Sequence, residues 1–389
     1  MAVDPLLSEA ELAHGALAAQ RLRTEIGQAG GWISFERFMD LALYAPGLGY
    51  YSAGAHKLGE GGDFTTAPEI SRLFGACIAE QCAAVMDALG EGSILEIGAG
   101  SGALAADLLG HLEAQGRAPA RYFILEVSAD LKARQARTLE ARVPELAGRV
   151  VWLDAPLSSP FDGVVLANEV LDALPVTRFR WREEACEELG VALEGERFAW
   201  AARPANESLR RACAVRAAAG GGWDDGYTSE YCPRLPAWTA EVTRGHRRGL
   251  VLWIDYGLPR RQYYFPERRE GTLLCHFRQR TDDDPLSYPG LKDITAWVDF
   301  THLAEASAPA GYALAGFTTQ AYFLAGLGID RQMQRLAADD ERGGARLAAD
   351  ARRLLMPGEM GERFKAMAWL KGMDLPLAGF ALKDLRHVL

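Results

Sequence analysis

The chain has 389 residues, of which 49% are hydrophobic, so it can bury a large core and more than one structural unit. Its formal net charge of −10 argues against nucleic acid as a partner, because phosphate binding requires a basic surface. Its six cysteines form no CxxC pair and its histidines lack metal-ligand spacing, so we expect neither a disulfide framework nor a metal site.

Helices are predicted over most of the N-terminal part. Residues 1–30 have an amphipathic pattern that ends at paired glycines, and residues 33–44 form a second helical pattern before a Pro-Gly break. Thr66 and Glu69 have the spacing of a capping box. We therefore expect Thr66 to cap a third helix that runs to about Leu89, because apolar residues recur there with the helical period.

Apolar strands alternate with helices in the centre of the chain. Helical patterns at 103–116 and 129–142 connect the first three strands. The strand patterns lie at 93–98, 121–128, 149–154, 161–168 and 249–257. This alternation predicts an α/β fold with a parallel, Rossmann-like sheet that helices cover on both faces. Ligands bind such sheets at the carboxyl ends of the strands.

Other stretches depart from this alternation. Residues 176–204 alternate around a Glu-Gly turn and predict β-hairpins, residues 313–320 read as a late edge strand, and residues 330–389 read as largely helical. We therefore expect a division into an N-terminal helical cover with a lid loop over 1–85, a Rossmann-like domain over 86–325 with an insertion at about 176–247, and a C-terminal helical region over 326–389.

The run ILEIGAGSG is the most informative motif. Gly98, Gly100 and Gly102 follow a predicted strand and open a predicted helix, where glycine permits positive φ and close approach of a ligand. With Ala103, the run also fits the dinucleotide-binding pattern GxGxxA. The glycines alone therefore allow two cofactors, NAD and S-adenosylmethionine.

Three acids at strand ends bear on this choice. Glu96 favours S-adenosylmethionine, because a carboxylate there would repel a pyrophosphate and attract an ammonium group; the alternative is a capped or solvated strand end. Glu126 is placed to accept hydrogen bonds from the ribose hydroxyls of either cofactor, or to lie as a charge before the next helix. Asp154 is placed to accept a hydrogen bond from the adenine amino group, or to form a turn.

Asn168, Glu169 and Asp172 follow a buried strand in the run LANEVLDALP. Carboxylates at the open end of such a strand are costly unless they are paired or solvated. These side chains therefore indicate a positively charged partner that the run itself does not contain.

Seven runs occur in a fixed order over about residues 30–372: GDFTTAPEIS, LEIGAGSG, LANEVLDALPV, IDYG, GTLLCHF, DITAWVDF and MGERFK. In these runs and their order the chain resembles the MidA-like methyltransferases. The resemblance implies a class I methyltransferase fold with S-adenosylmethionine as cofactor. It also implies a protein client, since the eukaryotic branch is a mitochondrial protein that methylates an arginine on a subunit of respiratory complex I and supports its assembly. After GTLLC the chain departs from the family, so no role is assigned to His276.

The resemblance extends to the GDFTTAPEIS run. Asp63 and Thr65 belong to a glycine-flanked loop, and Thr66 follows them. We expect these residues to contact the bound cofactor, with the loop acting as a lid.

An arginine of the client would supply the missing positive partner, because its guanidinium pairs bidentately with carboxylates. We expect Glu169 to bind the guanidinium, Asp172 to support it and Asn168 to orient the acceptor or the cofactor. The alternatives are that Asp172 caps a short helix in EVLDAL and that Asn168 only satisfies a backbone group.

The leading hypothesis is therefore a protein arginine methyltransferase. The alternatives are a non-catalytic assembly factor that retains the cofactor pocket and an NAD-dependent oxidoreductase. No secretory or transit signal is visible, and no apolar run approaches the roughly 20 residues of a membrane helix. We expect a cytoplasmic protein without membrane insertion, and we leave a homodimer open.

Overall fold

The computed structural model describes residues 7–52, 66–278, 280–338 and 344–389. Its internal contacts divide the chain into two compact units, each assembled from separate segments. Unit 1 comprises Met1–Phe64, Asp172–Arg234 and Arg260–Trp297, and unit 2 comprises Thr65–Leu171, Leu235–Pro259 and Val298–Leu389. The division into three parts expected from the sequence stays a prediction.

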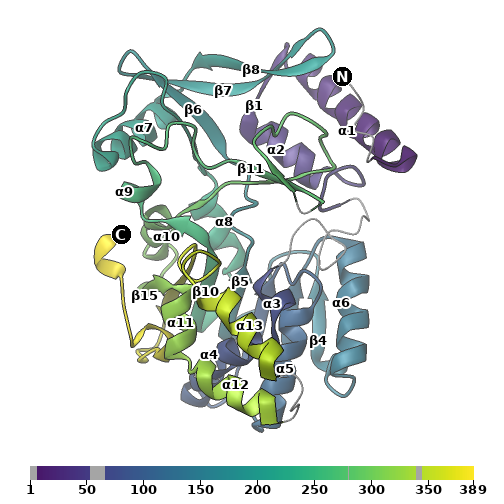
Figure 1. The fold of residues 1–389 in the computed structure, drawn as a ribbon, viewed down its shortest axis with the longest axis vertical. Coiled ribbons are helices and arrows are strands. Elements are labelled where there is room, and N and C mark those ends of the chain that lie inside the picture. Colours follow the sequence, from purple (N-terminus) through teal and green to yellow (C-terminus); the bar gives the residue numbers. More distant parts are fainter. Residues whose placement is uncertain (1–6, 53–65, 279, 339–343) are drawn as a thin grey trace. The chain divides into compact units, whose positions relative to one another are not determined.

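Unit 2 is built around a mostly parallel sheet, as the sequence predicts (Figure 1). The spatial order is β15-β16-β10-β5-β2-β3-β4, with β14 beside β10. The strands are β2 Ser93–Ile97, β3 Tyr122–Leu125, β4 Val150–Leu153, β5 Phe161–Asn168, β10 His246–Leu258, β14 Val298–Asp299, β15 Ala313–Thr319 and β16 Phe364–Lys371. The pairs that β16 forms with β10 and β15 are antiparallel, and the other described pairs of this sheet are parallel.

The strand order reverses beside β2. From β2 the chain adds β3 and β4 on one side, and it then returns to place β5 on the other side, against β2. In this pair Ile97 lies opposite Ala167, so the next residues, Gly98 and Asn168, leave the two strands at the same level. Open parallel sheets bind ligands at such a switch point.

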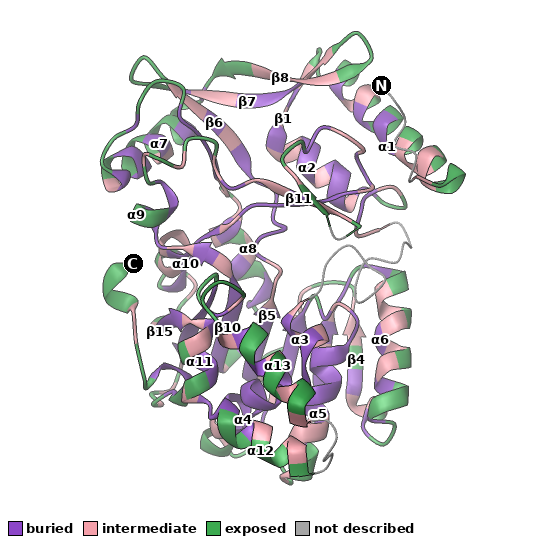
Figure 2. Ribbon diagram, viewed as in Figure 1, coloured by how far each residue is buried: buried purple, intermediate pink, exposed green. Residues whose placement is uncertain are grey.

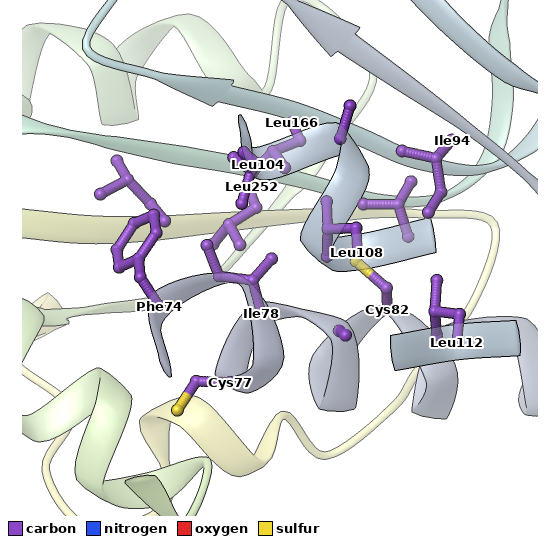
Figure 3. Close-up of a cluster of buried hydrophobic side chains, with 14 of the residues drawn as sticks. Phe74, Cys77, Ile78, Cys82, Ile94, Leu104, Leu108, Leu112, Leu166 and Leu252 are labelled. Carbon is purple, nitrogen blue, oxygen red and sulfur yellow. The ribbon is translucent and has the colours of Figure 1, made fainter. Parts of the chain in front are cut away.

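Helices cover both faces of the sheet, whose central strands are buried (Figure 2). On one face, α4 and α5 pack against Ile94, Leu166 and Leu252 (Figure 3). On the other face, Trp253 of β10 contacts Trp238 of α8 at a ring-centroid distance of 6.2 Å. The helices are α3 Ala67–Ile70, α4 Arg72–Leu89, α5 Ala103–Ala114, α6 Ala129–Arg142, α8 Leu235–Val242, α10 Phe300–Ser307, α11 Gln320–Gly326, α12 Ile329–Ala338 and α13 Gly344–Leu355.

The expectation of a largely helical C-terminal region is wrong for Phe364–Lys371. This segment is β16, which pairs with β10 on one side and β15 on the other. Its residues are almost all buried, so its sequence lacks the polar–apolar alternation of a half-exposed strand. The expected edge strand at 313–320 is confirmed as β15.

The start of the long helix α4 also differs from the expectation. Ser71 is extended and caps this helix, with its Oγ accepting the N–H of Leu73 at 3.3 Å. Thr66 precedes only the one-turn helix α3 and makes no side-chain capping hydrogen bond. The capping box predicted for Thr66 and Glu69 is therefore wrong, and Glu69 instead hydrogen-bonds the hydroxyl of Ser101.

In its described residues, unit 1 forms two antiparallel sheets. In the larger sheet, β7 pairs with β8 along one edge and with β6 and β1 along the other, and β9 pairs with β6. The hairpins expected at 176–204 are confirmed. The strands are β1 Trp32–Ser34, β6 Thr177–Arg182, β7 Ala185–Glu194, β8 Arg197–Pro204 and β9 Thr228–Tyr231, with β11 Leu274–Phe277, β12 Arg280–Asp282 and β13 Asp293–Thr295 in the smaller sheet.

The helices of unit 1 are α1 Glu9–Gln28, α2 Phe35–Tyr44, α7 Glu207–Gly220 and α9 Arg260–Tyr263. Phe35 of α2 contacts Trp200 of β8 in the core of this unit. Cys186 of β7 and Cys213 of α7 form a disulfide, which the scattered spacing of the cysteines did not indicate. Among the helices of the described ranges, none has the length and hydropathy needed to cross a membrane.

Candidate functional site

The loop after β2 keeps its backbone open to a ligand. Gly98, Gly100 and Gly102 have φ values of 64°, 55° and 84°, which other residues adopt only with strain. A Cβ at Gly98 would lie 3.1 Å from Val170 Cγ2, so this glycine also permits close packing against the chain after β5. Helix α5 begins at Ala103, directly after the loop.

Glu126 follows β3 at the same edge of the sheet. Its Oε1 accepts the N–H of Ser128 at 2.9 Å, and its Oε2 accepts a hydrogen bond from Nε2 of Gln135 at 3.2 Å. Burial raises the pKa of Glu126, whereas these donors favour its charged form. The geometry suits an acceptor of ribose hydroxyls, which is the role predicted from the sequence.

Glu96 is more deeply buried than the sequence suggested. It lies within β2, and its Oε2 accepts a hydrogen bond from the hydroxyl of Tyr122 at 2.7 Å. Burial raises the pKa of Glu96 to about 7, and the nearby charge of Glu126 acts in the same direction. Glu96 therefore changes charge near neutral pH.

Asp154 lies on the surface beyond β4. Its side chain is 88% exposed and forms an ion pair with Lys132 of α6. The predicted contact of Asp154 with the adenine amino group stays a prediction, as do the assignments of the other candidate residues.

Asn168 ends β5 at the switch point, and Glu169 follows it. Oε1 of Glu169 accepts a hydrogen bond from Nδ2 of Asn168 at 3.1 Å and another from the N–H of Ala67 at 3.3 Å. Glu169 has a φ of 54°, an uncommon conformation for a residue other than glycine. Such strain persists only where the surrounding structure enforces it, and it occurs often at functional sites.

Asp255 of β10 holds the segment that follows Glu169. Its Oδ2 accepts the N–H groups of Val170 at 3.1 Å and Leu171 at 2.9 Å, and its Oδ1 accepts the N–H of Tyr256 at 2.8 Å. The N–H of Glu169 donates to the carbonyl of Ile254 at 2.9 Å. The short helix considered for EVLDAL does not form; this run is a turn held by β10.

Asp172 is the first residue of a segment of unit 1, where it is buried. Within this unit Tyr44 stacks on Tyr51, and the hydroxyl of Tyr51 donates to Oδ1 of Asp293 at 2.9 Å. Burial and the negative charges of Asp293 and Asp172 raise the pKa of both tyrosines well above the usual value. Both tyrosines are therefore neutral hydrogen-bond donors at physiological pH.

Two of the predicted lid residues, Asp63 and Thr65, lie outside the described residues. Thr66 is the first described residue after them. Gln135, which the sequence pattern did not single out, is fully buried on α6 and donates to both Glu126 and the carbonyl of Gly100. Its only signal is its position four residues before Leu139, the other buried residue of that helix.

The residues at this edge fit S-adenosylmethionine. Oδ1 of Asn168 is buried and makes no hydrogen bond with the residues that the structure describes, so it is an acceptor available to a donor group of a ligand. Glu126 supplies carboxylate oxygens for ribose hydroxyls, and the glycine loop leaves room at the backbone. In the described ranges, no group of three or more His, Cys, Asp or Glu side chains is arranged to hold a metal ion.

Comparison with known proteins agrees with this geometry. A crystal structure of a protein from Burkholderia thailandensis bound to S-adenosyl-homocysteine is 42% identical, with a TM-score of 0.94, and the match covers 99% of this chain and 100% of that one. A second structure from the same organism is 41% identical, with a TM-score of 0.91 and the same coverage. The choice between NAD and S-adenosylmethionine left open by the glycines is thereby decided, and the cofactor is S-adenosylmethionine.

Curated relatives match nearly the whole chain. "Protein arginine methyltransferase NDUFAF7, mitochondrial" from Danio rerio is 30% identical over 90% of this chain and 89% of that protein. The human protein of the same name is 29% identical over 87% of this chain and 80% of its own length. Residues 77–318 match the model of the family described as "Putative S-adenosyl-L-methionine-dependent methyltransferase". The chain belongs to this family and is an S-adenosylmethionine-dependent methyltransferase with the class I fold.

Proposed function

We propose that this methyltransferase transfers a methyl group to the guanidinium of an arginine in a protein client. The relatives named above as protein arginine methyltransferases support an arginine acceptor. The observation that carries the proposal is the carboxylate of Glu169, which follows β5 beside the glycine loop in a strained, enforced conformation. A guanidinium is the side-chain cation that pairs best with such a carboxylate.

The bound cofactor would be held by residues of unit 2. Glu126 would accept hydrogen bonds from its ribose, the glycine loop would leave room for its methionine part, and Asn168 and Glu96 would accept from its ammonium group. Asp154 is assigned to the adenine amino group. S-adenosylmethionine supplies an electrophilic methyl group on a positively charged sulfur.

Glu169 has two tasks in this proposal. A guanidinium nitrogen is a poor nucleophile because its lone pair is delocalised. A carboxylate that pairs with the other nitrogens draws the positive charge toward them and leaves the attacking nitrogen richer in electrons. A carboxylate oxygen of Glu169 would take the proton that this nitrogen loses as its bond to the methyl carbon forms and the carbon–sulfur bond of the cofactor breaks, with the electron pair left on sulfur. Orienting the acceptor in this way can contribute roughly 7–11 kcal/mol to lowering a barrier.

Asp172 is proposed to support the acceptor with a second negative charge. It is buried, and it raises the pKa of Tyr44 and Tyr51 within unit 1. Its substitution is therefore expected to weaken acceptor affinity more than cofactor affinity.

The product of the reaction tests the proposal. The full chain is incubated with S-adenosylmethionine carrying a labelled methyl group and with candidate clients, first a subunit of respiratory complex I, which the family resemblance implies. The products are digested and analysed by mass spectrometry. We expect the label on arginine.

Two results would contradict the proposal. Label on lysine, a carboxylate or a small molecule would show another acceptor class. Cofactor binding without transfer to any protein would favour an assembly factor that only holds its client. Glu169→Gln is the matched control: it keeps an acceptor oxygen for Ala67 and Asn168 and changes the charge.

A further inference from the structure

We propose that Gln135 is a positioning residue for the cofactor, which fixes the carboxylate of Glu126 and the backbone of Gly100 in one arrangement. The inference rests on the proposed role of Glu126 at the ribose. It concerns cofactor binding alone, so it is independent of the identity of the methyl acceptor.

Gln135 is an unusual residue for its helix. Of the residues of α6, only Gln135 and Leu139 are buried, and the others are half-buried or exposed (Figure 2). Leu139 joins the hydrophobic core, as expected for an inward position. Gln135 has no exposed surface, and burying an amide costs free energy unless its polar atoms are hydrogen-bonded.

The amide of Gln135 is bonded at both ends. Its Nε2 lies 3.2 Å from Oε2 of Glu126 and 3.2 Å from the carbonyl oxygen of Gly100. Its Oε1 accepts the indole N–H of Trp152 at 2.9 Å. An indole N–H can only donate, and a carbonyl or ionised carboxylate can only accept, so the partners allow one orientation of the amide.

The glycine loop also approaches the backbone of α6 at this residue. A Cβ at Gly102 would lie 3.0 Å from Cα of Gln135 and 3.3 Å from its carbonyl oxygen. The loop therefore contacts Gln135 at two points. The carbonyl of Gly100 accepts a hydrogen bond from the side chain of Gln135, and Gly102 packs closely against its backbone. A shift of the side chain of Gln135 would break its hydrogen bonds to Gly100 and to Glu126 together.

The side-chain amide of Gln135 therefore connects the glycine loop with the carboxylate of Glu126. Glu126 lies at the end of β3 and Gly100 lies in the loop after β2, and one amide bonds both. Trp152 on β4 holds the oxygen of that amide by donating its indole N–H. Without the amide, Glu126 would keep the N–H of Ser128 but lose the donor at its other oxygen.

The first test is the affinity of the full chain for S-adenosylhomocysteine, measured by calorimetry. For Gln135→Leu we expect a dissociation constant at least about tenfold higher than that of the wild type, because a hydrogen bond to a charged group is lost. The matched control is Gln320→Leu. Gln320 is also fully buried, and its Nε2 donates to the carbonyl of Leu354 at 3.0 Å, away from the loop. The control should melt at a lower temperature with unchanged affinity.

The second test separates positioning from general destabilisation. Gln135→Leu is combined with Glu126→Gln, and the affinities of the four proteins form a double-mutant cycle. We expect Gln135→Leu to weaken binding far less when Glu126 is already substituted. Equal fold-changes in both backgrounds would overturn the inference. An unchanged affinity in Glu126→Gln alone would remove the ribose role and the inference together.

A third variant covers failure of the leucine variant to fold. Gln135→Glu supplies a donor to Glu126 only when its carboxyl is protonated. Its affinity for S-adenosylhomocysteine, relative to that of the wild type, should therefore rise as the pH falls. A constant ratio across the pH range would contradict the inference.

Discussion

Asp255→Asn is expected to unfold the protein more easily and to slow methyl transfer. The carboxylate of Asp255 accepts three backbone N–H groups, those of Val170, Leu171 and Tyr256. It is fully buried, so water cannot replace a lost partner. Asparagine offers one oxygen and one NH2 group, and the NH2 group must face at least one of these three donors.

The expected loss of stability follows from the number of these N–H groups that asparagine cannot accept. If the amide oxygen keeps Val170 and Leu171, the N–H of Tyr256 meets another donor. Losing a hydrogen bond to a charged group, with one buried donor left unpaired, costs roughly 2–4 kcal/mol. For a domain of about 150–250 residues this lowers the melting temperature by roughly 5–15 °C. Glu169 adjoins this turn, and a displacement of about 1 Å can cost about 10²-fold in turnover.

The assay compares thermal unfolding, affinity for S-adenosylhomocysteine and turnover. The control is Asp162→Asn, the same chemical change at the other end of β5, where Asp162 pairs with the exposed side chain of Arg247. This pair should contribute little to stability, since ion pairs with an exposed partner are weak. If both variants unfold and turn over alike, Asp255 does not hold the turn of Glu169.

Three further predictions concern the loop and two buried titratable groups. Gly102→Ala should abolish the rise in melting temperature that S-adenosylhomocysteine causes, because the added Cβ would clash with Gln135 and the residue has a positive φ. Gly110→Ala in α5 is the control. An equal rise in melting temperature in the two variants would contradict the prediction. The carboxyl of Glu96, whose pKa is raised to about 7, must be charged to attract an ammonium group, so affinity should rise by up to about tenfold from pH 6 to 8 and stay flat in Glu96→Gln. Burial lowers the pKa of His246 from 6.5 to about 4. As the pH falls, this histidine is therefore protonated in the unfolded state before it is protonated in the folded state. The free energy of unfolding should decrease by roughly 3 kcal/mol between pH 6.5 and pH 4. Urea unfolding of His246→Gln should show a smaller loss over that range, and an identical pH dependence would refute the assignment.

Local patterns predicted the glycine loop and its place at the edge of the sheet. The strand, the three glycines and the following helix lie within one continuous run, so their arrangement depends on residues close in sequence. The parallel sheet followed from the same alternation, and parallel strands bring their carboxyl ends to one edge. Glu126, Asn168 and Glu169 could therefore be placed near the glycines.

Features that depend on distant partners escaped prediction. The run EVLDAL has helical composition, yet Asp255 of β10 binds its backbone and Glu169 takes a positive φ. The strand β16 joins the sheet only because β10 and β15 present free edges to it. Gln135 looks like any polar residue of an outer helix until Trp152 and Gly100 are placed around it.

The central claim is that Glu169 binds and activates the acceptor guanidinium, and Glu169→Gln tests it most directly. Glutamine keeps an oxygen for the hydrogen bonds from Ala67 and Asn168, so the local fold should persist. We predict unchanged affinity for S-adenosylhomocysteine and a fall in kcat of about 10²–10⁴-fold, the range for a residue that takes up a proton in the reaction. Turnover of Glu169→Gln at the wild-type rate under saturating cofactor and acceptor would contradict the account.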